Sequence, residues 1–315
     1  MNEVFLPPRH SLQAVQTRLK NFLWGMASRF ALQGLCTWEL EDHWLLMPRM
    51  EMRLAGLGQG FDGTVLCHLS DVHLSPLMRE RHLQQYIDIV NRMEPDFIVI
   101  TGDFITASAR HYARKVGILS QLHARIAVLA CLGNHDYGVW KPQGNTGVRG
   151  LGDYVAEQLD RCGIVPLVNN SQTYCREGSK IHFVGIGELW TSLYDPAAAF
   201  WSIPDDEPII ALCHNPDAAY DLASFGADLI LSGHTHGKYV ADTRINNLLF
   251  PVEYRHFVAG RYDLGDRRLL YVNRGMGHAR RNAEHHRPEI PVFTLCDARP
   301  RVRTPNGHRD KLAVS

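Results

Sequence analysis

Five short groups of acidic, amide and imidazole side chains are spread along the chain, each close behind a run of apolar residues. They are Asp71-Val72-His73, Gly102-Asp103, Gly133-Asn134-His135-Asp136, His214 and Gly233-His234-Thr235-His236-Gly237. Carboxylate, imidazole and amide groups are ligands for Mn, Fe, Zn or Co, and a shared carboxylate can hold two such cations roughly 3.5 to 4 Å apart. No cysteine belongs to these groups, which argues against a structural zinc site. The pattern therefore predicts a site for two divalent cations.

Glycine directly precedes Asp103, Asn134 and His234 in these groups. A residue without Cβ lets the backbone turn sharply and approach a metal or phosphate closely. Alternatively, the same three glycines simply form the turns at which ordinary loops begin.

The elements that must position these groups are strands alternating with longer helical stretches, a rhythm that begins at about residue 50 and is typical of strand-helix-strand units. A helix is expected over residues 78–93, before Pro95. Strands are expected at residues 64–69, 96–100, 126–132, 181–186, 209–213, 229–231, 269–272 and 291–295. Continuous apolar strands indicate sheets covered on both faces, and ligands gather at strand ends in such sheets. The expected fold class is α/β.

The composition narrows the function classes. With 33 basic and 33 acidic residues among 315, the chain has no overall charge to attract nucleic acid. Seven scattered cysteines favour thiols in a reducing compartment. No apolar run approaches the roughly 20 residues of a spanning helix, and no signal-peptide pattern begins the chain. A cytoplasmic enzyme is expected, with no nucleic-acid partner.

Residues 12–30 have an amphipathic helical pattern. The apolar positions, at three- and four-residue steps, are Leu12, Val15, Leu19, Phe22, Leu23, Met26 and Phe30. Residues 1–30 hold four Arg or Lys against the single Glu3. A basic amphipathic helix suits an anionic membrane surface, and packing on the core is the equally open alternative. The predicted organisation is an N-terminal segment at 1–50, an enzyme domain at 51–296 and a flexible tail at 297–315.

Motif by motif, the five groups resemble the calcineurin-like metallophosphoesterase family, and the resemblance covers about residues 64–295. It implies a four-layer αββα fold, a β-sandwich flanked by helices, that hydrolyses phosphoesters. It also implies that one metal is held by Asp71, His73, Asp103 and His236, and a second by Asp103, Asn134, His214 and His234. Asp103 would bridge the two. In this family pattern His135 donates a hydrogen bond to the phosphate or leaving oxygen, and Asp136 orients it.

The late stretches 271–277 and 287–295 resemble a bacterial branch of the family with membrane-associated phosphodiesterases and a variant UDP-2,3-diacylglucosamine hydrolase. That resemblance implies cleavage of the pyrophosphate of UDP-2,3-diacylglucosamine, in lipid A synthesis, to UMP and 2,3-diacylglucosamine 1-phosphate. It also implies peripheral attachment to the cytoplasmic face of the inner membrane. Thr106 stands where purple acid phosphatases carry a tyrosine ligand, so we expect a manganese pair, with zinc or iron as alternatives.

Substrate contacts are harder to place from the sequence. The candidates are Arg274, Trp140, Lys141, Trp190 and Lys238, which come from aromatic, basic or glycine-flanked stretches. They could equally be exposed loop side chains with no role in binding. Two alternatives to the lipid substrate stay open. One is a general metal-dependent phosphodiesterase or phosphatase acting on soluble nucleotides, and the other is a non-catalytic metal-binding scaffold.

Overall fold

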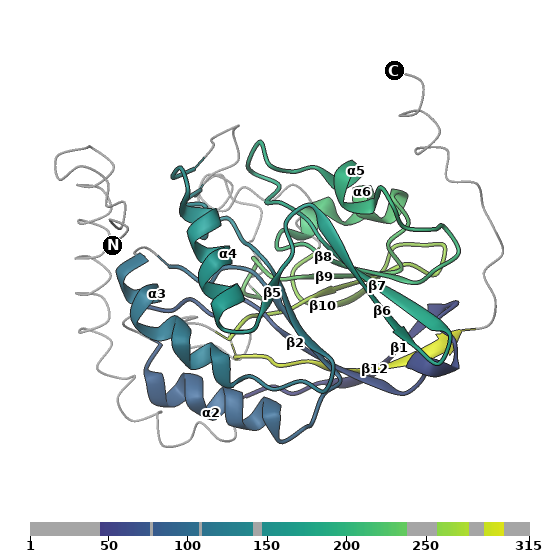
Figure 1. Ribbon diagram of the computed structural model, residues 1–315, viewed down its shortest axis with the longest axis horizontal. Coiled ribbons are helices and arrows are strands. Elements are labelled where there is room, and N and C mark those ends of the chain that lie inside the picture. Colours follow the sequence, from purple (N-terminus) through teal and green to yellow (C-terminus); the bar gives the residue numbers. More distant parts are fainter. Residues whose placement is uncertain are drawn as a thin grey trace. The chain divides into compact units, whose positions relative to one another are not determined.

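The computed structural model describes residues 45–75, 78–106, 109–140, 147–237, 257–276 and 287–298. These residues form two six-stranded sheets (Figure 1). The first sheet has the order β1 (Arg49–Ala55), β12 (Val292–Ala298), β2 (Thr64–Leu69), β3 (Phe97–Thr101), β4 (Ala127–Cys131), β5 (Val165–Pro166). The second has the order β10 (Gly260–Asp263), β11 (Leu269–Val272), β9 (Leu229–Ser232), β8 (Ile209–Leu212), β7 (Ser179–Gly185), β6 (Asn170–Arg176).

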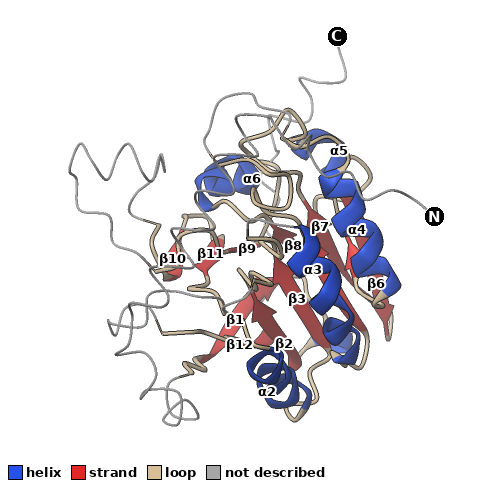
Figure 2. Ribbon diagram, turned by 90° about the vertical axis from the view of Figure 1, so that its left-hand side faces the viewer, coloured by secondary structure: helices blue, strands red, loops and turns tan. Residues whose placement is uncertain are grey.

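Helices cover the outer faces of the two sheets. Figure 2 shows α2, α3 and α4 beside the first sheet, and α5 and α6 belong to the stretches between strands of the second. Their bounds are α2 (Glu80–Asn91), α3 (Ala109–Lys115), α4 (Leu151–Arg161), α5 (Pro196–Phe200) and α6 (Ala219–Ser224). The part of the chain that the structure describes also holds three short 3-10 helices, η3 (Gln59–Phe61), η4 (Val116–Gln121) and η5 (Pro216–Ala218). None of the described helices has the length and hydropathy needed to cross a membrane.

Strand residues alternate between two hydrophobic layers, which explains the continuous apolar runs in the sequence. In β3, Phe97 and Val99 face the layer between the sheets, whereas Ile98 and Ile100 face the layer under α2, α3 and α4. The ring centroid of Phe97 lies 4.7 Å from that of Phe183 in the opposite sheet. A third layer lies between the second sheet and α5 and α6. The predicted four-layer αββα fold is confirmed.

Parallel pairing places the predicted ligand groups at one end of the sandwich. Strands β2 to β5 run parallel in the first sheet, and β7, β8, β9 and β11 run parallel in the second. Antiparallel strands β6 and β10 close the two edges of the second sheet, and β12 is antiparallel to β2. β1 pairs with β12 along its whole length, from Arg49 to Ala55. The amphipathic stretch 12–30 and residues 299–315 lie outside the described residues.

Candidate metal centre

The groups that follow β2 and β9 bring Asp71, His73 and His236 together. Asp71 Oδ1 lies 3.4 Å from His236 Nε2 and 3.9 Å from His73 Nε2, and the two imidazole nitrogens are 3.2 Å apart. The other carboxylate oxygen, Oδ2, accepts hydrogen bonds from the Ser70 hydroxyl (2.7 Å) and the His234 backbone N–H (3.1 Å). Asp71 Oδ1 is buried without a hydrogen-bond partner. It is therefore left to face the two imidazoles.

Asp103, after β3, occupies the middle of the site. Its Oδ2 lies 3.2 Å from His214 Nε2, 3.7 Å from His73 Nε2 and 3.8 Å from His135 Nε2. Its Oδ1 accepts the backbone N–H of His135 at 3.0 Å. One carboxylate oxygen thus faces imidazoles from three different loops.

The groups after β4, β8 and β9 bring Asn134, His214 and His234 into the same site. His214 Nδ1 donates to the Thr101 carbonyl at 2.6 Å, so Nε2 is the nitrogen that points toward Asp103. Asn134 Nδ2 donates to the Val139 carbonyl at 2.8 Å, which turns its Oδ1 toward His234 Nδ1 at 3.0 Å. Ligand atoms that share one ion with bonds of about 2.1 Å lie roughly 3 Å apart. Asn134 with His234, and Asp103 with His214, are therefore two pairs with the spacing of ligand atoms that share an ion.

The donor set fits divalent cations. Three groups of side chains offer ligand atoms within 4.8 Å of one another: Asp71 with His73 and His236, His73 with Asp103 and His135, and Asp71 with Asp103 and His214. Nε2 of His214, like Oδ1 of Asp71, is buried with no hydrogen-bond partner. Buried polar atoms are rarely left without partners, and a bound cation would supply one. The groups overlap at Asp71, His73 and Asp103, so adjacent ions would share ligands.

Burial and opposite charges shift the pKa values of the central groups. Burial raises the pKa of Asp71 to about 6, against the lowering effect of His214. Burial also acts to raise the pKa of Asp103, but His135 and His214 hold it well below its ordinary value. For His214, burial acts to lower the pKa, but Asp103 and Asp71 outweigh it and hold it well above its ordinary value. The site is thus a buried set of carboxylates that requires positive charge close by.

Left-handed backbone marks the predicted ligands. Asp71, His73, Asp103, His234 and His236 all have positive φ, between 45° and 72°. Non-glycine residues rarely adopt this conformation, and clusters of such strain occur at functional sites. A Cβ at Gly133 would overlap the Asp103 carboxylate, so this glycine permits close approach of two ligand loops to each other. We expected an approach to metal or phosphate.

His135 and Asp136 have separate hydrogen-bond partners. His135 Nδ1 donates to the Thr106 carbonyl at 2.9 Å, which directs Nε2 toward Asp103. The Asp136 carboxylate instead accepts the backbone N–H groups of Ile105 and Gly133, each at 2.9 Å. The structure therefore places Asp136 as the tie between the loops after β3 and β4, and the observed support of the His135 ring is the Thr106 carbonyl. The His135 side chain is 19% exposed, so a substrate can reach it.

The substrate candidates are only partly described. Trp140 packs edge-on against His135 with ring centroids 4.0 Å apart, and it is 41% exposed. Trp190 packs edge-on against His234 at 4.6 Å and is nearly buried, so it supports a ligand ring more than it offers a surface. Arg274 lies in the loop after β11 with its side chain partly exposed. Lys141 and Lys238 lie outside the described residues.

Glu188 is a site residue that we did not predict. It follows β7, is 1% exposed, and its Oε2 has no hydrogen-bond partner. Burial raises its pKa to about 7, although the nearby His214 acts to lower it. The Gly187-Glu188 pair follows a buried strand in the same way as Gly102-Asp103, and that pattern could have revealed it.

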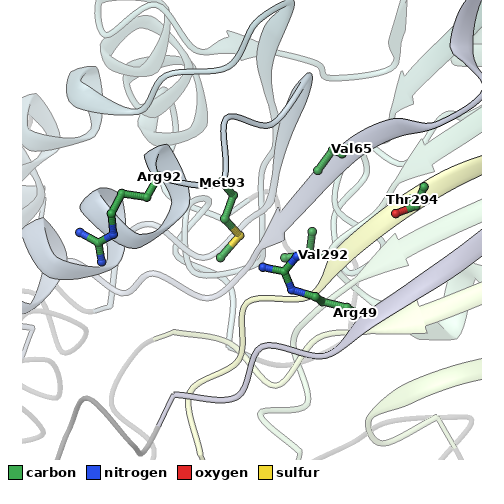
Figure 3. Close-up of a pocket in the computed structure, with 6 residues that line it drawn as sticks. All are labelled: Arg49, Val65, Arg92, Met93, Val292 and Thr294. Carbon is green, nitrogen blue, oxygen red and sulfur yellow. The ribbon is translucent and has the colours of Figure 1, made fainter.

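A cavity of about 320 Å³ lies elsewhere, on the outer face of the first sheet beside the end of α2. Its lining residues are Arg49, Val65, Arg92, Met93, Val292 and Thr294 (Figure 3). Figure 3 shows the guanidinium groups of Arg49 and Arg92 well apart, so they do not converge on one anion. None of the predicted site residues lines it.

The family profile of the calcineurin-like phosphoesterases matches residues 64–238, which is more than half of the chain. The chain belongs to this family. The matched segment contains the ligand-type groups after β2, β3, β4, β8 and β9. The chain is therefore a metallophosphoesterase, a hydrolase of phosphoesters, and the family together with the donor set points to divalent metal ions.

Several curated metallophosphoesterases are similar over most of their length. YkuE of Bacillus subtilis, an uncharacterised metallophosphoesterase, is 31% identical over 261 residues, with 81% of this chain and 87% of the relative covered. The UDP-2,3-diacylglucosamine pyrophosphatase LpxG of Chlamydia muridarum is 26% identical over 296 residues, covering 81% and 90%. The phosphodiesterase YaeI of Escherichia coli is 28% identical over 228 residues, covering 72% and 80%. These relatives thus carry two different activities in their names, UDP-2,3-diacylglucosamine pyrophosphatase and phosphodiesterase.

Proposed function

We propose that this metallophosphoesterase binds two divalent cations and cleaves the pyrophosphate of UDP-2,3-diacylglucosamine to UMP and 2,3-diacylglucosamine 1-phosphate. The observation that carries the two-cation part is the position of Asp103, whose Oδ2 faces imidazoles from three loops. One cation would be held by Asp71, His73, Asp103 and His236. The other would be held by Asp103, Asn134, His214 and His234.

Bound cations of this kind neutralise phosphate oxygens and lower the pKa of water. The protein supplies positioning around them. Asp103 fixes the spacing of the two sides of the site, and Ser70 and the His234 N–H hold Asp71 so that Oδ1 faces His73 and His236. His135 donates from Nδ1 to the Thr106 carbonyl, so in its protonated form it would present Nε2–H as a hydrogen-bond donor for the phosphate or the leaving oxygen.

The choice of substrate is supported by the likeness to LpxG and by the surroundings of His135. Trp140 offers a half-open aromatic face next to this imidazole, where a base or sugar can stack. The basic amphipathic stretch 12–30 would hold the enzyme on the anionic cytoplasmic face of the inner membrane, where a diacylated substrate resides. Manganese is the proposed metal, with zinc or iron as alternatives.

The second candidate function is a general phosphodiesterase on soluble nucleotides, which the likeness to YaeI favours. It requires the same metal ligands and differs only in the substrate pocket. A non-catalytic scaffold is the least favoured, because all seven predicted ligand positions carry ligand-type side chains.

The deciding experiment compares substrates on one preparation. Full-length protein loaded with Mn²⁺ is assayed for UMP release from UDP-2,3-diacylglucosamine and, in parallel, on bis(4-nitrophenyl) phosphate and a cyclic nucleotide. We expect a kcat/KM at least about 100-fold higher on the lipid nucleotide, a difference of about 3 kcal/mol in transition-state binding. Comparable values on all three substrates would refute the lipid assignment. No turnover by protein that holds two metals would instead support the scaffold.

Membrane attachment is tested separately by deleting residues 1–30. The intact chain should sediment with vesicles that contain anionic phospholipid, and the shortened chain should stay in the supernatant at the same ionic strength. Equal partitioning of both forms would show that the basic stretch is not the anchor.

A further inference from the structure

The loop that follows β11 lies against the metal centre and carries Arg274. A Cβ placed on its neighbour Gly275 would lie 2.7 Å from Cβ of Asp71, so the loop touches this predicted ligand directly. The Met276 N–H donates to the Ser70 carbonyl at 2.9 Å. Arg274 is therefore attached to a backbone whose position is fixed by the same loop that presents Asp71.

Glu289, just before β12, holds this loop through its backbone and its side chain. Its N–H donates to the Gly275 carbonyl at 3.1 Å, and its Oε2 accepts the Arg274 backbone N–H at 3.2 Å. The same oxygen lies 3.4 Å from Nε of the Arg274 guanidinium. Oε1 accepts the Tyr271 hydroxyl. With 3% exposure, Glu289 is a buried carboxylate with both oxygens engaged.

Glu289 contacts the Arg274 guanidinium at Nε, which leaves the Nη1–Nη2 edge of the guanidinium for a ligand. The ion pair uses Nε, and within the described part of the chain no hydrogen bond or ion pair is assigned to Nη1 or Nη2 of Arg274. The Arg274 side chain is 31% exposed. Two guanidinium nitrogens on one edge match the spacing of two phosphate oxygens and can bind them as a fork.

We propose that Glu289 is a positioning residue that holds Arg274 so that its Nη1 and Nη2 atoms receive the anionic phosphoester next to Asp71. This inference rests on the proposed function, because it concerns binding at the same site. A buried carboxylate lowers the stability of the fold unless hydrogen bonds or an ion pair compensate for its lost hydration. Both oxygens of Glu289 have such partners, Tyr271 and Arg274, at the two ends of the segment that leads into this loop. Glu289 thus acts on the substrate only through the arginine.

A double-mutant cycle on the full-length, Mn²⁺-loaded protein tests this dependence. Arg274→Ala should raise KM for bis(4-nitrophenyl) phosphate roughly 10- to 100-fold, the loss of charge-assisted hydrogen bonds. Glu289→Gln should raise it about 5- to 10-fold with a smaller change in kcat, because the neutral amide holds Nε less firmly. The double variant should match Arg274→Ala alone. Metal content should remain at the wild-type value throughout, since neither residue is a predicted ligand.

Two further variants guard against a loss of folding. Tyr271→Phe removes only the hydroxyl that Glu289 accepts, and should raise KM about 2- to 3-fold in the wild-type background but not beside Arg274→Ala. The matched control is Glu157→Gln, which breaks the exposed 2.6 Å pair with Arg161 on α4 and should leave KM unchanged. If the increases in KM multiplied in the double variants, the proposal would be overturned, because Glu289 or Tyr271 would then affect KM independently of Arg274.

Binding of inorganic phosphate, measured by calorimetry on the same proteins, separates this proposal from the proposed function. Phosphate affinity should fall in Arg274→Ala and Glu289→Gln in the same non-additive way. If the wild-type protein hydrolyses no phosphoester but phosphate affinity follows this pattern, the positioning role stands and the enzymatic proposal fails. If hydrolysis proceeds but the two substitutions act independently, the positioning role is wrong.

Discussion

Two clusters of polar side chains in this protein satisfy their charges in opposite ways. The first is formed by Lys180 and His182 of β7 with Glu207, and in it His182 Nδ1 pairs with the Thr173 hydroxyl (2.8 Å) and Nε2 with Glu207 Oε2 (2.5 Å). The remaining Glu207 oxygen accepts Lys180 Nζ at 2.8 Å. Every polar atom of the His182 and Glu207 side chains therefore has a protein partner.

The metal centre differs because its key atoms face one another without completing hydrogen bonds. Asp71 Oδ1 and His214 Nε2 are buried and unpartnered, although carboxylates and imidazoles lie 3.2 to 4.0 Å away. A cluster whose polar atoms all have protein partners stabilises the fold. A cluster with unpartnered buried polar atoms indicates a place where a ligand supplies the missing partners. The unpartnered buried atoms therefore indicate where a ligand binds, without reference to any cavity. Four experiments test whether the two clusters differ in this way.

The largest effect should come from Asp103→Ala. If Asp103 is the shared ligand that we propose, its loss would leave two cations without a common carboxylate, so activity should fall at least about 10³-fold together with metal content. Mass spectrometry of the metals on purified protein gives the second readout. A variant that lost activity but kept two metals per chain would contradict the bridging role.

His135→Ala should slow turnover by about 10² to 10⁴, the usual contribution of a positioned proton donor. Unlike the Asp103 variant, it should keep both metals, because its ring is held by the Thr106 carbonyl and is not a proposed ligand. Measuring kcat and metal content on the same sample separates the two effects. Since His135 Nε2 lies 3.8 Å from Asp103, loss of metal would instead make it a ligand.

Removal of metal should lower thermal stability. Binding of a cation at about 1,000 times its Kd stabilises the folded state by about 4 kcal/mol, which corresponds to a rise in Tm of about 10 °C for a domain of this size. Chelated protein titrated with Mn²⁺ in a thermal scan should show this rise. Asp71→Asn should reduce it, whereas Lys180→Met in the satisfied cluster should leave it intact.

The smallest effect should come from Glu207→Gln, which touches only the satisfied cluster. Burial acts to raise the pKa of Glu207, but Lys180 and His182 hold it below its ordinary value of 4.5. The stability it contributes is therefore present at pH 7 and lost as the pH falls below that value. The variant should melt no more than about 3 °C below wild type at pH 7 and together with it at pH 3, with unchanged kcat. A large loss of activity would remove the contrast between the clusters.

Much of the fold could be predicted because the central strands are buried on both faces. The expected ranges 64–69 and 269–272 agree with β2 and β11, and the other six expected strands differ only at their ends. Sequence pattern missed β6, an edge strand with mostly polar, exposed residues, because no apolar run marks it. The two-residue strand β5 is too short to leave any pattern.

The site was predictable where side chains carry the information. The seven predicted ligands lie together, although their roles as ligands stay predictions. The support of His135 by the Thr106 carbonyl could not be predicted, because a backbone acceptor has no residue type. The contact between Glu289 and Arg274 could not be predicted for a different reason, because the sequence does not show that Glu289 meets a loop 15 positions before it.

The left-handed turns at Asp71, His73, Asp103, His234 and His236 have a consequence for anyone who would transplant this centre into a new scaffold. Copying these five side chains onto ordinary extended or helical segments would aim them incorrectly, since the directions of their Cα–Cβ bonds depend on these unusual torsions. A transplanted site would therefore need the end of each strand together with the left-handed turn that follows it. A library that randomises neighbouring positions would keep Gly133, whose replacement would push a Cβ into the Asp103 carboxylate.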